Sequence, residues 1–191
     1  WKEVSQIKDD IADRILAEID TLKDFADADF LSNREKCTKE WALEEGLLEI
    51  VGKEIDDAYI EAVKSLSLND ENLDKSLRIV FTPLNGAGNV PVRSVLRERG
   101  FDNVFVVKEQ EDPDGRFPTI EYPNPEDVRA FEYALKLAKE VDGELLIATD
   151  PDCDRIAIIA KHQGEYVEIN GNEAGYILVH YLLSQMSQQG K

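Results

Sequence analysis

Residues 145–160 read LLIATDPDCDRIAIIA, two apolar runs on either side of a charged loop. The runs 145–149 and 156–160 are short and aliphatic, which is typical of buried strands. Between them lies Asp150-Pro151-Asp152-Cys153-Asp154-Arg155, called the Asp loop below. The stretch therefore predicts two strands joined by a loop that carries charged groups.

The Asp loop holds three carboxylates at alternate positions. Asp150, Asp152 and Asp154 face the same way if the backbone stays extended. Converging carboxylates repel one another unless a cation lies between them, and hard oxygen ligands select Mg²⁺, Mn²⁺ or Ca²⁺. Arg155 adds a fixed positive charge that suits a phosphate. The loop therefore predicts a metal site beside a phosphate group.

Three other kinds of structure can carry a similar run of acidic residues. A solvated acidic turn stays open, because the whole chain is acidic. An EF-hand loop is excluded, since it needs Glu at its twelfth position, where this chain has Lys161. A haloacid-dehalogenase-type phosphatase resembles the chain less well. Such enzymes usually have Thr or Val where Asp154 stands and need a long catalytic region downstream, whereas only residues 155–191 follow here.

Length and composition set the broad class of protein. A chain of 191 residues can bury one good-sized core, with 42% hydrophobic and 32% charged residues. The net charge of −18 argues against partners such as nucleic acid or an anionic membrane. No apolar run approaches the roughly 20 residues of a membrane span, and no signal peptide is visible.

The two cysteines, Cys37 and Cys153, make no disulfide framework, so the reducing cytoplasm is the expected location. The chain begins at Trp1 rather than Met, which indicates a piece of a longer protein.

The hydrophobic pattern changes along the chain. Apolar residues recur at helical spacing in residues 4–22, 39–51 and 54–66, so residues 1–75 are expected to be helical. From Leu77 onward, strands alternate with helices. Strands are expected at about 77–81, 104–107, 145–149, 156–160 and 166–169. Three helices are expected in this part of the chain. The first follows the loop that ends at Gly88 and runs through Arg99, the second runs from an Asn124 N-cap to Gly143, and the third covers 174–186.

This alternation predicts an α/β fold, a three-layer α/β/α sandwich preceded by N-terminal helices. The sheet is expected to be mixed and mainly parallel, with about four strands, and its last pair could be antiparallel.

Four motifs in series resemble one family, the α-D-phosphohexomutases or phosphoglucomutase/phosphomannomutase family. They are Phe81-Thr82-Pro83-Leu84-Asn85-Gly86-Ala87-Gly88, Phe117-Pro118-Thr119, Pro123-Asn124-Pro125-Glu126 and the Asp loop. Together they look like the second domain of these enzymes. The later Asn170-Gly171-Asn172-Glu173 resembles the entry into the third domain. The resemblance covers about residues 40–185.

The resemblance implies a domain plan and a chemistry. Residues 1–75 would lead from the end of domain 1, residues 76–170 would be domain 2, and residues 171–191 would begin domain 3. In this family a phosphoserine exchanges its phosphoryl group with a hexose phosphate through a bisphosphate intermediate. Asp150, Asp152 and Asp154 would then hold Mg²⁺, and Arg155 would lie near the phosphoryl group in transfer. A pentose phosphate is a less favoured substrate, and the missing domains of the same chain are the expected partners.

Other family motifs are absent from this sequence. It lacks the phosphoserine loop, the Gly-Glu-x-Ser sugar loop and the phosphate loop of domain 4, so the isolated chain is expected to have no mutase activity. Asn85 stands where relatives often carry His. Gly86 and Gly88 could cradle a phosphate, although a tight strand-to-helix turn is the favoured interpretation. A non-catalytic module that binds metal or phosphate stays open as an alternative.

Overall fold

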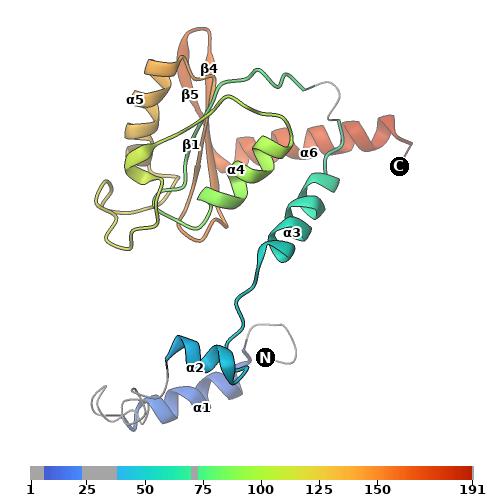
Figure 1. The fold of residues 1–191 in the computed structure, drawn as a ribbon. Coiled ribbons are helices and arrows are strands. Elements are labelled where there is room, and N and C mark those ends of the chain that lie inside the picture. The colour runs from blue at the N-terminus through green and yellow to red at the C-terminus, as the bar shows by residue number, and fades with distance from the viewer. Residues whose placement is uncertain (1–6, 23–37, 70–72, 191) are drawn as a thin grey trace. The chain divides into compact units, whose positions relative to one another are not determined.

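A computed structural model describes residues 7–22, 38–69 and 73–190 (Figure 1). The chain divides into two compact units, Trp1–Val51 and Gly52–Lys191. Expectations that rest on Trp1, Val4 and Cys37 lie outside the described residues. The domain limits expected from the sequence stay predictions. Among the described helices, none has the length and apolar character that a membrane crossing requires.

The first unit contains the helices α1 (Asp9–Ile19) and α2 (Lys39–Glu44). Thr38 caps α2, because its side chain accepts a hydrogen bond from the backbone N–H of Trp41 at 3.1 Å. The expectation of a helix up to residue 51 was wrong. Gly46 adopts a φ of 68°, and the N–H groups of the next two residues both donate to the carbonyl of Ala42, which ends the helix.

The second unit holds a five-stranded sheet in the order β2-β1-β3-β4-β5. The strands are β1 (Ile79–Thr82), β2 (Val104–Val106), β3 (Leu145–Thr149), β4 (Ile156–His162) and β5 (Glu165–Ile169). β1 pairs in parallel with β2 and β3, while β3–β4 and β4–β5 are antiparallel. The mixed α/β sheet is confirmed, and a strand forms at each of the five expected ranges, although the fold as a whole was expected to have about four. Both β3–β4 and β4–β5 are antiparallel, whereas antiparallel pairing was considered only for the last pair.

The described part of the second unit also contains four α-helices, of which α3 packs on α4 rather than on the sheet. They are α3 (Lys53–Ser65), α4 (Asn89–Glu98), α5 (Glu132–Val141) and α6 (Gly171–Gln188), with the short 3₁₀ helices η4 (Lys108–Gln110) and η5 (Val128–Phe131). The crossover through α4 runs from β1 to β2, and the one through α5 runs from β2 past β1 to β3. Because right-handed crossovers in opposite directions place their helices on opposite faces, α4 and α5 lie on the two sides of the sheet (Figure 1).

The main core lies between the sheet and α5. Ala134 and Ala138 of α5 are fully buried and pack among side chains of β1, β3 and β4. Small residues let the helix approach the sheet closely. The other buried members of this cluster are Val80, Val107, Phe131, Leu146, Ala148, Ala157 and Ile159.

The ends of α5 differ from the expectation. In the described chain α5 itself begins after Phe131 without a side-chain cap. Asp127, not Asn124, caps the preceding η5, because its carboxylate accepts from the N–H of Arg129 at 3.0 Å. At the other end the left-handed residue is Asp142 (φ 53°) rather than Gly143. Gly143 is required for space, since a Cβ there would lie 2.9 Å from Val80 Cγ2.

This topology decides where a site can form. The parallel strands β1, β2 and β3 end at the same edge of the sheet, so the loops that follow them meet there. These loops cover residues 83–88, 107–127 and 150–155. The three other sequence motifs that resemble the mutases therefore come together with the Asp loop at one edge.

Candidate metal centre

The Asp loop is a turn rather than an extended segment. The N–H of Cys153 donates to the carbonyl of Asp150 at 3.0 Å, and Cys153 adopts a left-handed φ of 63°. The three carboxylates do converge, but the expectation that an extended backbone brings them together was wrong. The turn itself gathers Asp150, Asp152 and Asp154, each of which offers an oxygen within 4.8 Å of the others.

Asp150 anchors the loop on its buried side. It is 1% exposed, whereas Asp152 and Asp154 are open to solvent. Its two oxygens accept from Arg155, one from the backbone N–H at 3.0 Å and one from Nε at 2.9 Å. One buried carboxylate thus fixes both the backbone and the guanidinium of Arg155.

The electrostatics follow from this arrangement. Burial by itself would raise the pKa of Asp150, but the hydrogen bonds from Arg155 outweigh it and hold that pKa below its usual value. Asp154 behaves in the opposite way. The charge of Asp152, with Asp150 close by, raises the pKa of Asp154. The carboxylates of Asp152 and Asp154 thus repel one another, and a cation between them would relieve the repulsion.

The loop after β1 supports the Asp loop through its backbone. The N–H of Ala87 donates to the carbonyl of Pro151 at 2.8 Å. A Cβ on Gly86 would lie 2.3 Å from Pro151 Cα, so only glycine allows this approach. A Cβ on Gly88 would lie 2.8 Å from both Cys153 Sγ and Thr149 Oγ1. The two glycines therefore serve close packing against the Asp loop.

The same contacts favour a tight turn over a phosphate cradle. The N–H of Gly86 donates to the carbonyl of Pro83 at 2.9 Å, and the N–H of Ala87 is used by Pro151. Leu84 and Asn85 both adopt left-handed conformations, with φ of 47° and 57°. The N–H groups of Gly86 and Ala87 are therefore already hydrogen-bonded within the protein and are not free to bind a phosphate.

A buried polar network joins the loops after β1 and β2. Gln110, 1% exposed, accepts from Thr82 Oγ1 at 2.7 Å and donates to Thr119 Oγ1 at 3.0 Å. Asn85 donates from Nδ2 to the carbonyl of Asp112 at 2.8 Å. Within the described part of the chain, its buried Oδ1 has no hydrogen-bond partner. Asn85 thus has a structural role here, since it ties the two loops together. The sequence pattern gave no indication of the buried role of Gln110.

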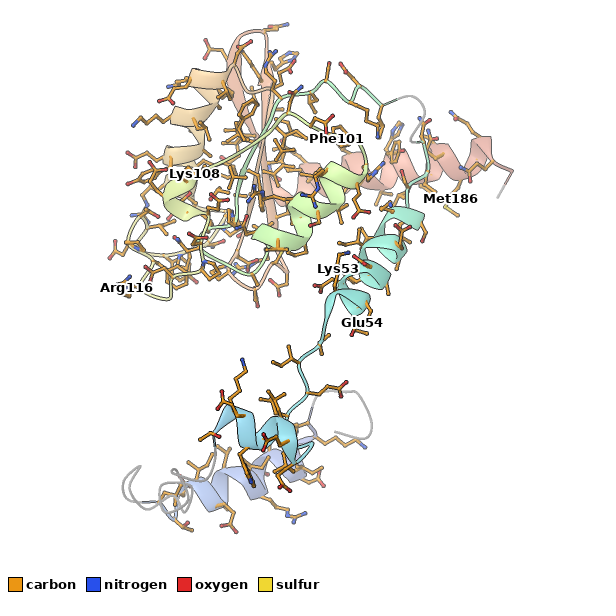
Figure 2. The ribbon with its side chains drawn as sticks, viewed as in Figure 1. Lys53, Glu54, Phe101, Lys108, Arg116 and Met186 are labelled. Carbon is orange, nitrogen blue, oxygen red and sulfur yellow. The ribbon has the colours of Figure 1, made fainter. Side chains whose placement is uncertain are left out.

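Asn124 also reaches the Asp loop, which its expected role as a helix cap did not suggest. Its Oδ1 accepts from Nη1 of Arg155 at 3.2 Å. Arg116, by contrast, lies at the outside of its loop (Figure 2) and is 87% exposed. It pairs with Asp114, and its guanidinium lowers the pKa of Asp114 to about 2.

The donor set decides which metal fits. The three carboxylate oxygens are hard ligands, which suit Mg²⁺, Mn²⁺ or Ca²⁺. The only thiol in the loop, Cys153, packs towards Gly88 and Thr149. The loop therefore fits a hard divalent cation, and Asp150, Asp152 and Asp154 are the residues that would hold it.

Comparisons with known proteins point to one family. The family model described as phosphoglucomutase/phosphomannomutase, alpha/beta/alpha domain II, matches residues 57–164. A phosphoglucomutase of Staphylococcus saprophyticus is 36% identical over 138 residues, which is 72% of this chain and 25% of that protein. A probable phosphomannomutase of Haemophilus influenzae is 38% identical over 143 residues, 74% of this chain and 28% of that protein.

Solved structures give the same fold. A putative phosphomannomutase from Thermus thermophilus superposes with a TM-score of 0.56 at 25% identity, over 69% of this chain and 29% of that one. A Burkholderia thailandensis protein of the phosphoglucomutase/phosphomannomutase family has the same TM-score at 21% identity and supports the fold alone. This chain spans about a quarter of the length of the relatives it matches.

Proposed function

The chain belongs to the phosphoglucomutase/phosphomannomutase family, and from this premise we propose that it forms the Mg²⁺-binding corner of a phosphohexomutase active site. The reaction would interconvert hexose 1-phosphate and 6-phosphate through a phosphoserine and a bisphosphate. The observation that carries the proposal is the convergence of Asp150, Asp152 and Asp154 within 4.8 Å, with Arg155 held beside them.

Each residue of the Asp loop has a distinct part in this proposal. Asp150 is buried and negatively charged, so it anchors Arg155 and offers the most rigid ligand. Asp152 and Asp154 are exposed and complete the set of oxygens on the open side. A bound Mg²⁺ would neutralise charge on the phosphoryl group in transfer. Arg155, 48% exposed at its side chain, would contact the phosphoryl oxygens directly.

The chain holds neither the serine loop nor the sugar-binding loops of the family. We therefore expect no conversion of glucose 1-phosphate to glucose 6-phosphate by the purified chain with Mg²⁺ and a bisphosphate activator. A coupled dehydrogenase assay would measure it, with a complete phosphoglucomutase as the positive control. Turnover above the no-protein rate would contradict the proposal that the serine nucleophile and the sugar-binding groups lie outside this chain.

The coding sequence around this chain tests the enzyme assignment. We expect a phosphoserine motif upstream of Trp1 and a Gly-Glu-x-Ser motif downstream. A gene that encodes the Asp loop without either motif would contradict the mutase and favour a non-catalytic module that binds metal or phosphate.

A further inference from the structure

We propose that Asn124 is a positioning residue that fixes the orientation of the Arg155 guanidinium toward a phosphoryl group. The role of Arg155 at a phosphoryl group rests on the proposed function, whereas its contact with Asn124 does not. The contact joins two loops that lie 31 residues apart in the sequence, with Oδ1 of Asn124 at 3.2 Å from Nη1 of Arg155.

Asn124 is itself held in place. Its Oδ1 also accepts from the N–H of Glu126 at 3.1 Å, which forms a local Asx turn. Its backbone N–H donates to the carbonyl of Tyr122 at 2.8 Å. Pro123 and Pro125 flank it, and each proline fixes one backbone angle and restricts the residue before it. Pro125 is fully buried, so the turn is anchored in the protein.

Asn124 restricts the part of the Arg155 side chain that Asp150 does not hold. Asp150 holds the backbone N–H and Nε of Arg155, which leaves the outer end of the guanidinium free to swing about its stem. The bond from Nη1 to Asn124 adds a second point of attachment from another loop. Together with the covalent bond to Cδ, the contacts at Nε and Nη1 fix the plane of the guanidinium. In the described part of the chain these bonds use Nε and Nη1, so Nη2 remains available for a ligand oxygen.

The chemistry of the amide suits this task. Arg155 already lies among acids, since Asp150, Asp154 and Glu126 all raise its pKa. A further carboxylate at position 124 would hold the guanidinium but would also repel an approaching phosphate. The amide oxygen of Asn124 accepts a hydrogen bond without adding a negative charge. Asn124 therefore orients Arg155 without lowering its attraction for a phosphate.

Side-chain ¹⁵N NMR of this chain tests the proposal through the rotation rate of the Arg155 guanidinium. The variant Arg155→Lys identifies the Arg155 signals by their loss. Asn124→Ser is the main variant, because the serine hydroxyl can keep the turn through Glu126 N–H but is too short to reach Nη1. Asn124→Asp keeps an acceptor of the same length. Asn103→Ala removes an exposed asparagine at the opposite end of β2 as the matched control.

We expect the rotation rate to rise about three- to tenfold in Asn124→Ser, and to stay at the wild-type value in Asn124→Asp and in the control. The dissociation constant for inorganic phosphate, measured with Mg²⁺ by the shift of Arg155 Nε, should rise by a similar factor in Asn124→Ser. In Asn124→Asp phosphate should also bind more weakly, although the guanidinium stays fixed.

Unchanged rotation in Asn124→Ser would overturn the positioning role. The proposed function fails separately. If phosphate and Mg²⁺ leave the Arg155 signals of the wild type unmoved, Arg155 faces no phosphoryl site, and this part of the proposal is overturned with the proposed function. The rotation rates still decide whether Asn124 positions Arg155 in that case.

Discussion

Replacing Gly86 by alanine is expected to displace the Asp loop and to weaken its metal binding by about 10- to 100-fold. The added Cβ would lie 2.3 Å from Pro151 Cα and 2.5 Å from the Pro151 carbonyl oxygen. Backbone atoms cannot rotate away as a flexible side chain does, so the two loops must separate. The separation also strains the bond from Ala87 N–H to the Pro151 carbonyl, which now measures 2.8 Å.

The same change should lower the free energy of unfolding by about 1–3 kcal/mol, as overpacking of a tight site does. Urea unfolding measures the stability, and Mn²⁺ relaxation enhancement measures the binding. Gly115→Ala is the matched control, because a Cβ at position 115 would meet no atom within 4 Å and its loop is at the same edge of the sheet. Wild-type metal affinity in Gly86→Ala would show that the Asp loop does not depend on this close approach.

The second large effect is expected at Asp150. The change Asp150→Asn puts an amide nitrogen or a neutral oxygen opposite Nε of Arg155, where the buried carboxylate now accepts at 2.9 Å. Because Asp150 is 1% exposed, water cannot replace the lost acceptor. We expect the free energy of unfolding to fall by about 1–3 kcal/mol. Localised Mn²⁺ binding should disappear at concentrations on the order of 10 mM, since the loop also loses a charged ligand.

Asp154→Asn separates the two consequences. Asp154 is 73% exposed and lies 3.8 Å from Nε of Arg155, so its carboxylate contributes little to folding. It should lose metal affinity while its urea midpoint stays at the wild-type value. Equal losses of stability in the two variants would mean that Asp150 is not the anchor of the loop.

The sequence predicted the sheet well where hydrophobic runs were continuous. β3 matches its expected range of 145–149, and β4 begins at the expected Ile156. A buried strand needs an unbroken apolar run, and that pattern is local. The grouping of Asp150, Asp152 and Asp154 was also visible, because all three belong to one short segment.

Long-range contacts lay beyond such local patterns. Asn124 precedes a proline and acids, as a helix cap does, and nothing in its neighbours indicates a contact with Arg155, 31 residues further on. Gln110 has an ordinary polar context, yet packing buries it between Thr82 and Thr119. The left-handed turn at Cys153 was missed for a related reason. Alternation of residue types predicts an extended strand, whereas hydrogen bonds to Asp150 decide the actual backbone.

A titration of the chain with Mn²⁺, followed by NMR, tests most directly whether the Asp loop is a preformed metal centre. We expect paramagnetic broadening confined to the neighbourhood of residues 150–155, with a dissociation constant on the order of millimolar. The broadening should be lost in Asp152→Asn, which removes an exposed ligand. Broadening scattered over the acidic surface, or unchanged in Asp152→Asn, would contradict a preformed metal site and leave the loop as a solvated acidic turn.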